Sequence, residues 1–201
     1  LREFSQRGLW SRYKESGTIA LGQVNKVVRW LEGNMLVERR KGRYVLSNPT
    51  GLLRAISLFR PMRELRAFSS SVDLPRQEVM ESLRERAIFC LGTALEKYGS
   101  YFRSPEISFY AVDWRRLENG YAGMREGLTK LTCYRMDFLE PGALVLDSSQ
   151  ISLERQVDDL ISKHSDGSRY TSEVLTVLDM FCDGKAHYTK ELLKDVWGVE
   201  L

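Results

Sequence analysis

Four cationic side chains surround one glycine in the segment VERRKGRYVL, residues 37–46. Like charges held this close repel one another, so their gathering favours a polyanion as the partner. Guanidinium and ammonium groups can replace the counterions that condense on a phosphate backbone, which favours binding to nucleic acid. The alternative is a solvated basic surface that binds nothing. The four cations are Arg39, Arg40, Lys41 and Arg43.

The residues around this segment predict a hairpin that follows a helix. Two short β-like runs, MLVERR and RYVLS, flank Lys41-Gly42, where a hairpin needs its turn. Before them, TIALGQVNKVVRWLEGN has apolar residues three and four apart, and Gly33-Asn34 is a good helix stop. The apolar positions expected on the inner face are Leu21, Val24, Val27, Val28 and Leu31.

Polar side chains occupy the other side of this predicted helix. In a helix that enters the major groove, the first turns reach the base edges. Gln and Asn can bind adenine with two hydrogen bonds, and Arg can bind guanine or a phosphate. Exposed polar residues without a ligand are the alternative, and we expect Trp30 to pack against the hairpin or the next helix. The candidate DNA-contacting residues of the helix are Gln23, Asn25, Lys26 and Arg29.

A shorter helix is expected in SQRGLWSRYKESG, which gives the order helix, turn, helix, basic hairpin. The segment ALGQVNKVVRWLEGNMLVERRKGRYVLSNPTGLL resembles the recognition helix and wing of archaeal and bacterial winged-helix regulators, over about fifty residues. The usual first helix is absent or compressed, which agrees with a chain that begins at Leu1 rather than at methionine. The resemblance implies binding to double-stranded DNA, with protein contacts as the alternative use of such a fold.

Charge is distributed unevenly along the chain, with an excess of cations in the first sixty residues. Residues 1–60 hold 12 Lys and Arg against 4 Asp and Glu, whereas the remaining residues hold 18 against 23. No apolar run approaches the length of a membrane span, and no secretory signal opens the chain, so we expect a cytoplasmic protein. The cysteines form no CxxC pair, which predicts reduced, buried thiols and no zinc site. They are Cys90, Cys133 and Cys182.

The rest of the chain predicts helices, then strands, then helices, which is an α+β or α/β pattern. We expect a winged helix-turn-helix over residues 1–50, a connector over 51–74 that ends in an SSSVD loop, and an α/β domain over 75–201. Helix PRQEVMESLRERAIFCLGTALEKYG is predicted, broken near Leu91-Gly92, followed by strands EISFYAVD, LTKLTCYRMDF and GALVLDSS. Helix SLERQVDDLISKHS, with Leu153, Val157, Leu160 and Ile161 on its inner face, and two more helices complete the prediction.

The order winged helix, AIFCLGTALEKYG, strands and ISLERQVDDLI resembles AbiEi-type antitoxin regulators, in which a winged helix precedes a nucleotidyltransferase-like domain. Active nucleotidyltransferases carry Gly-Ser at a helix start. On the next strand they carry two acidic residues, separated by one residue, which hold Mg²⁺. Here Gly92 precedes Thr93, Ser108 and Tyr110 stand at the acidic positions, and Asp113 is alone. The resemblance therefore implies a degenerate domain that is not an enzyme and binds no metal or cofactor.

Other candidates for chemistry are weaker. His164 and His187 are expected at the surface, and Asp158 and Asp159 point too far apart on a helix to share a metal. We therefore predict a DNA-binding transcriptional regulator, a repressor or antitoxin-like protein with a non-catalytic second domain. The alternatives are a nucleotidyltransferase-like enzyme or nucleotide sensor that uses Asp113, and a module that binds a cognate toxin. The sequence leaves open whether the chain forms a homodimer or binds a protein through its second domain.

Overall fold

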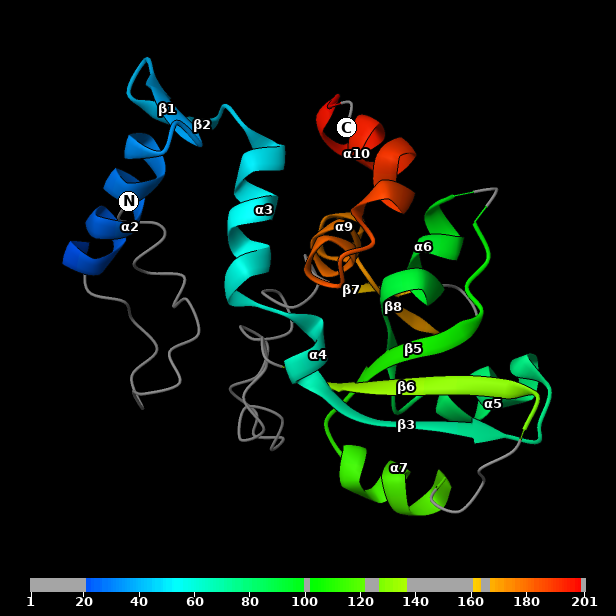
Figure 1. Ribbon diagram of the computed structural model, residues 1–201. Helices are drawn as coiled ribbons and strands as arrows, with labels where there is room; N and C mark the ends of the chain where they lie inside the picture. Colours follow the sequence, from blue (N-terminus) through cyan, green and yellow to red (C-terminus); the bar gives the residue numbers. More distant parts are fainter. Residues whose placement is uncertain (1–20, 100–101, 122–126, 137–160, 164–166, 200–201) are drawn as a thin grey trace.

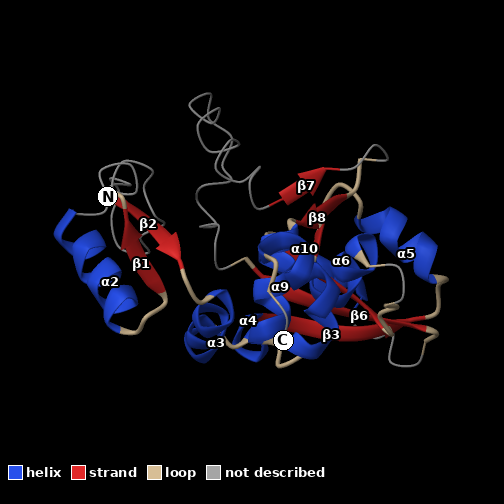
Figure 2. Cartoon of the chain, turned by 90° about the horizontal axis from the view of Figure 1, so that it is seen from above, coloured by secondary structure: helices blue, strands red, loops and turns tan. Residues whose placement is uncertain are grey.

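The computed structural model describes residues 21–99, 102–121, 127–136, 161–163 and 167–199. These residues form a mixed α+β protein, which confirms the predicted fold class at this coarse level. Figures 1 and 2 show one helix and a two-stranded hairpin set apart from a six-stranded sheet, with a second helix between them. The expected helix in residues 5–17 and the strand GALVLDSS lie outside the described residues.

The predicted helix and hairpin are both present. Helix α2 spans Leu21–Gly33, and strands β1 (Val37–Arg40) and β2 (Arg43–Leu46) form the antiparallel hairpin. The helix ends in a backbone motif in which the Leu36 amide donates to Leu31 and the Met35 amide to Glu32, both at 2.9 Å. Met35 has φ 56°, the left-handed conformation that such a helix end requires.

The hairpin turn is formed by Lys41 and Gly42, as the sequence predicted. Both residues have positive φ, 47° and 79°, and Arg40 pairs directly with Arg43 across the turn. Two consecutive left-handed residues match the twist of a two-residue hairpin, and glycine adopts this conformation without steric cost. The turn therefore holds the cationic residues together at the tip of a short, regular hairpin.

The expected connector forms regular structure throughout most of its length. Helix α3 (Pro49–Phe59) is capped by Asn48, whose side chain accepts from the Gly51 amide at 2.8 Å, and the short α4 (Met62–Leu65) follows. The SSSVD loop was predicted wrongly, because Ser69, Ser70 and Ser71 lie in strand β3 (Arg66–Val72). Serines lack the apolar alternation that indicates a strand, so pairing with a distant strand decides the structure here.

The sheet has the strand order β3-β6-β5-β4-β8-β7. The predicted strands EISFYAVD and LTKLTCYRMDF are present as β5 (Glu106–Ala111) and β6 (Thr129–Arg135), which run parallel. The β4–β8 pair is also parallel, whereas β3–β6, β4–β5 and β7–β8 are antiparallel. The remaining strands, which the sequence did not predict, are β4 (Ile88–Phe89), β7 (Ile161–Lys163) and β8 (Arg169–Thr171).

The end of the predicted helix SLERQVDDLISKHS was predicted wrongly, because residues 161–163 form strand β7. Ile161 was expected on the inner face of that helix, but it lies in a strand that pairs with Thr171 of β8. The other expected inner positions, Leu153, Val157 and Leu160, lie outside the described residues. A β-branched residue has weak helix preference, so pairing with β8 decides the conformation.

Helices cover both faces of the sheet. One hydrophobic cluster joins α6 (Leu91–Tyr98) and α9 (Glu173–Cys182) to Tyr110 and Tyr134, and a second joins α5 (Arg76–Leu83) and α7 (Trp114–Tyr121) to Phe109. Side chains of β5 therefore alternate between two covered faces, which explains why the strand is buried on both sides from Ile107 to Ala111. The chain ends in η1 (Ala186–Thr189) and α10 (Lys190–Trp197), so both predicted tail helices are present as α9 and α10.

The three cysteines are buried and form no disulfide, which confirms the expected burial. Burial raises the pKa of the Cys90 thiol well above its ordinary value, and the nearby Asp179 raises it further. Burial also raises the pKa of Cys133 to about 12. Both thiols are therefore protonated at neutral pH and make poor nucleophiles or metal ligands.

A buried ion pair joins α3 to the sheet. The Arg60 guanidinium, which directly follows α3, donates to Asp179 Oδ1 of α9 at 2.7 Å and to the Tyr110 hydroxyl of β5 at 2.8 Å. The Arg60 side chain is 14% exposed and that of Asp179 is fully buried. A buried carboxylate needs such a partner, because leaving it uncompensated is strongly unfavourable.

Arg60→Leu is expected to lower the free energy of unfolding by about 3 kcal/mol, because it leaves Asp179 buried without its cation. Arg86→Leu is the matched control, since Arg86 pairs with Asp113 at 2.7 Å while the two side chains stay 39% and 44% exposed. The control substitution should lower the free energy of unfolding by less than about 1 kcal/mol. Urea unfolding of the full chain measures both, and equal losses would contradict a special role for Arg60.

Candidate nucleic-acid interface

The hairpin presents its cations to solvent. Arg39, Arg40, Lys41 and Arg43 are all exposed. One ion pair joins Arg40 to Glu38 at 2.5 Å, with the side chains 68% and 42% exposed. A pair this exposed is screened by water and can exchange Glu38 for another anion at little cost. The tip therefore keeps an excess of positive charge, and Arg40 opposite Arg43 concentrates it.

One face of α2 is open beside the hairpin. Gln23 and Lys26 are exposed, and Trp30, seven residues after Gln23, returns to the same side at about 100° per residue. Val24 points the other way and is the buried residue of the helix. Gln23 and Lys26 thus lie together on the face that is free to meet a ligand.

The other two candidate residues of the helix lie elsewhere. Asn25 is half-buried, and Arg29, one turn later, is exposed on the flank of the helix next to it. The four predicted DNA-contacting residues of α2 therefore do not share one face. Of these, Gln23 and Lys26 lie on the open face of α2, and Arg29 is exposed on its flank.

Three apolar residues of α2 contradict the expected packing. Leu21, in the first turn, is 43% exposed, although the sequence predicted it on the inner face. Trp30 is 48% exposed and Val27 is 57% exposed, although the sequence predicted Val27 on the inner face and Trp30 in a packing role. Their positions relative to Gln23 and Lys26 place them on the open side of the helix. Trp30 is thus a candidate interface residue that we missed from the sequence, where its seven-residue spacing from Gln23 was the available signal.

The positions that would carry chemistry in a nucleotidyltransferase have structural partners here. The Thr93 hydroxyl accepts from the Ser108 amide at 2.8 Å and donates to the Glu106 carbonyl at 3.3 Å. Ser108 and Tyr110 are buried on one face of β5, and Tyr110 accepts from Arg60. Asp113 lies beyond the end of the strand, where it pairs with Arg86. These four residues supply one carboxylate, on an exposed loop.

Other candidate ligands are dispersed. His187 is exposed in η1, as predicted, while His164, Asp158 and Asp159 lie outside the described residues. Within the part of the chain that the structure describes, no three His, Cys, Asp or Glu side chains are close enough to hold a metal ion. In the same part, no helix has the length and apolar character needed to cross a membrane.

Comparisons with protein families, characterised proteins and solved structures found no match.

The hairpin generates a prediction about salt dependence. Arg40→Ala combined with Lys41→Ala should weaken binding to all double-stranded DNA sequences similarly. The slope of log affinity against log salt should become shallower by roughly 0.9 for each phosphate that the variant no longer neutralises. The control is Arg116→Ala with Lys190→Ala, which removes the same charge from exposed positions on α7 and α10. An unchanged slope in the hairpin variant would mean that the hairpin is not part of the DNA interface.

The arrangement around β5 generates a second prediction, that the chain transfers no nucleotidyl group. Magnesium needs anionic oxygens, and Ser108 and Tyr110 supply none, so charge on a transferred phosphate would stay uncompensated. The assay incubates the chain with Mg²⁺, labelled nucleoside triphosphates and acceptors, beside an Asp113→Ala variant. Transfer that disappears in this variant would contradict the prediction.

Proposed function

We propose that the protein is a transcriptional regulator that binds double-stranded DNA through a winged-helix unit formed by α2 and the β1–β2 hairpin. The observation that carries this proposal is the exposed cationic hairpin tip beside the open face of α2. A helix and an adjacent hairpin can contact a groove and the phosphate backbone together. The second domain is proposed to be non-catalytic.

Each element has a distinct role in this proposal. Helix α2 enters the major groove, where Gln23 and Lys26 reach base edges, and Trp30 contacts the groove wall or a thymine methyl group. Arg39, Arg40, Lys41 and Arg43 neutralise phosphates and supply affinity that does not depend on sequence. Arg29 adds a phosphate contact at the flank of the helix.

The proposal is tested by capturing genomic fragments with the purified chain at moderate salt and sequencing what is retained. A regulator should enrich a small set of fragments, whereas the Arg40→Ala, Lys41→Ala variant should retain less of every fragment. The Arg116→Ala, Lys190→Ala variant is the control for charge. Retention that is equal in all three proteins, or is absent for the unchanged chain, would contradict DNA binding through the hairpin.

Specificity gives a further prediction for the enriched site. Gln23→Ala should cost about 1–3 kcal/mol of binding free energy there if Gln23 pairs with a base. Binding to random DNA should barely change, because the phosphate contacts remain. Gln77→Ala, at an exposed position of α5, is the control. Titration of labelled duplexes measures both affinities, and equal losses on both DNAs would mean that Gln23 only positions the helix.

A further inference from the structure

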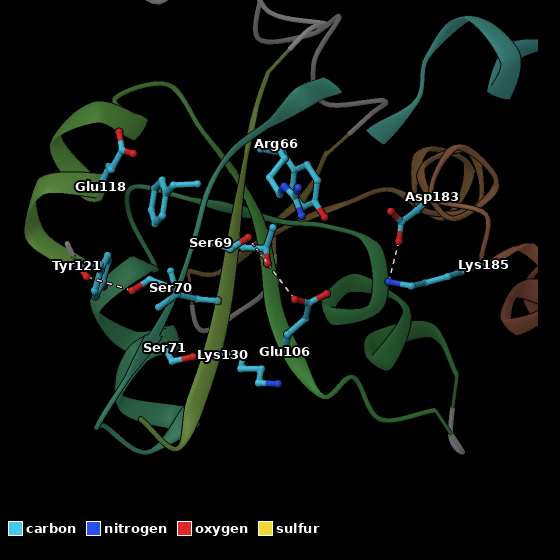
Figure 3. A pocket seen from close by; sticks show the side chains of 14 residues that line it. Arg66, Ser69, Ser70, Ser71, Glu106, Glu118, Tyr121, Lys130, Asp183 and Lys185 are labelled. Carbon is cyan, nitrogen blue, oxygen red and sulfur yellow. Dashed lines mark hydrogen bonds and ion pairs between the residues drawn. The ribbon is translucent and has the colours of Figure 1, made fainter. Parts of the chain in front are cut away.

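A pocket of about 640 Å³ extends around the edge strand β3, and its polar part lies on the open part of one sheet face (Figure 3). We use "polar recess" for the surface formed by Ser69 and Ser71 of β3, Lys130 and Thr132 of β6, and Glu106 of β5. Helices α6 and α9 cover this face over β5 and β8, and Asp183 and Lys185, just after α9, form the rim (Figure 3). The volume of the whole pocket is within the range of small-molecule sites.

Strand register brings these side chains together from three separate segments. Ser71, Lys130 and Glu106 are direct neighbours across β3, β6 and β5, and Ser69 and Thr132 are neighbours in the next row on the same face. The two rows are two residues apart along the strands, which is about 6.6 Å, so one small ligand can contact both rows. The recess is thus a continuous polar surface.

Hydrogen bonds within the recess leave acceptors facing outward. The Thr132 hydroxyl donates to Glu106 Oε2 at 2.9 Å, so its single hydrogen is used. Ser69, 3.2 Å from the Thr132 hydroxyl, must then be the donor in that contact, and its oxygen retains capacity to accept. Together with the second oxygen of Glu106, this creates a site for a group that donates hydrogen bonds, above all a cation.

The neighbouring cation is available for an anion. Lys130 is exposed and has no ion-pair partner among the described residues, although it is directly across from Glu106 in the strand register. Glu106 instead accepts a hydrogen bond from Thr132, and its charge also contributes to raising the pKa of Lys185 at the rim. At the rim, burial alone would lower the pKa of Lys185, but its hydrogen bond with Asp183, at 2.7 Å, raises it overall. The rim cation is therefore already compensated, whereas Lys130 is not.

From this arrangement we propose that the polar recess binds a small zwitterionic molecule, with its ammonium group at Glu106 and Ser69 and its anionic group at Lys130 and Ser71. The opposite charges of the ligand then match two opposite charges that the protein holds side by side but does not pair. A purely anionic ligand would meet the Glu106 carboxylate, and a purely cationic one would meet Lys130. The proposal concerns the second domain and does not depend on DNA binding.

The experiment is calorimetric titration of the full chain, without DNA, with three probes at millimolar concentration. O-phospho-L-serine carries both an ammonium and anionic groups, ethanolamine carries the ammonium alone, and inorganic phosphate carries the anion alone. Phosphoserine should bind at least about tenfold more tightly than either other probe, because a hydrogen-bonded charge contact is made at each end. No binding of phosphoserine would overturn the proposal.

Two variants locate the site. Glu106→Gln and Lys130→Gln should each weaken phosphoserine binding at least about tenfold, while Glu191→Gln and Lys190→Gln on α10 should not change it. Lys130→Gln changes an exposed side chain, so it remains a fair test even if Glu106→Gln lowers the melting temperature. A contrary result is that phosphate binds as tightly as phosphoserine, with an affinity that Glu106→Gln does not change. This result would mean a simple anion site and would overturn the proposal. Unchanged affinity in both recess variants would overturn it equally.

Discussion

One buried ion pair holds the end of the helix that connects the α2–hairpin unit to the sheet domain. Arg60 directly follows α3, and its guanidinium reaches both Asp179 of α9 and Tyr110 of β5. Because Asp179 is fully buried, its charge is tolerable only while Arg60 compensates it. The pair therefore fixes the end of α3 against the sheet domain, and α3 carries the hairpin and α2 at its other end (Figure 1). A loss of this pair would lower stability, although Leu53 of α3 would still pack against the apolar residues of α9.

Helix α9 links this anchor to the polar recess. Asp179 holds Arg60, and Asp183, one turn later, pairs with Lys185 at the rim of the recess. Residues four apart lie on the same side of a helix, so the anchor and the rim share one face of α9. Helix α9 thus contacts the residue that anchors α3 and, just beyond its end, the rim of the polar recess.

Local signals explain which parts could be predicted from the sequence. Helix α2, the Lys41-Gly42 turn and strand β5 have strong periodicity or turn chemistry, and each is present. Strands β3, β4, β7 and β8 were missed because the serine run and the strands of two or three residues become strands only by pairing with other segments. The hairpin cations were visible as a cluster, but the polar recess was not, because Ser71, Lys130 and Glu106 are neighbours only through strand register.

The anchor also bears on the chemistry expected near β5. Tyr110 occupies a position where a nucleotidyltransferase would need a carboxylate, and here its hydroxyl accepts from Arg60. Burial raises the pKa of this hydroxyl well above its ordinary value, and Asp179 raises it further, so it stays neutral beside the ion pair. An aspartate at this position would place a second carboxylate around the guanidinium that already compensates Asp179. Two buried carboxylates sharing one cation cannot both ionise easily. The space beside Tyr110 is therefore occupied by the Arg60–Asp179 ion pair that anchors α3, and an acidic metal-binding pair on β5 would compete for it.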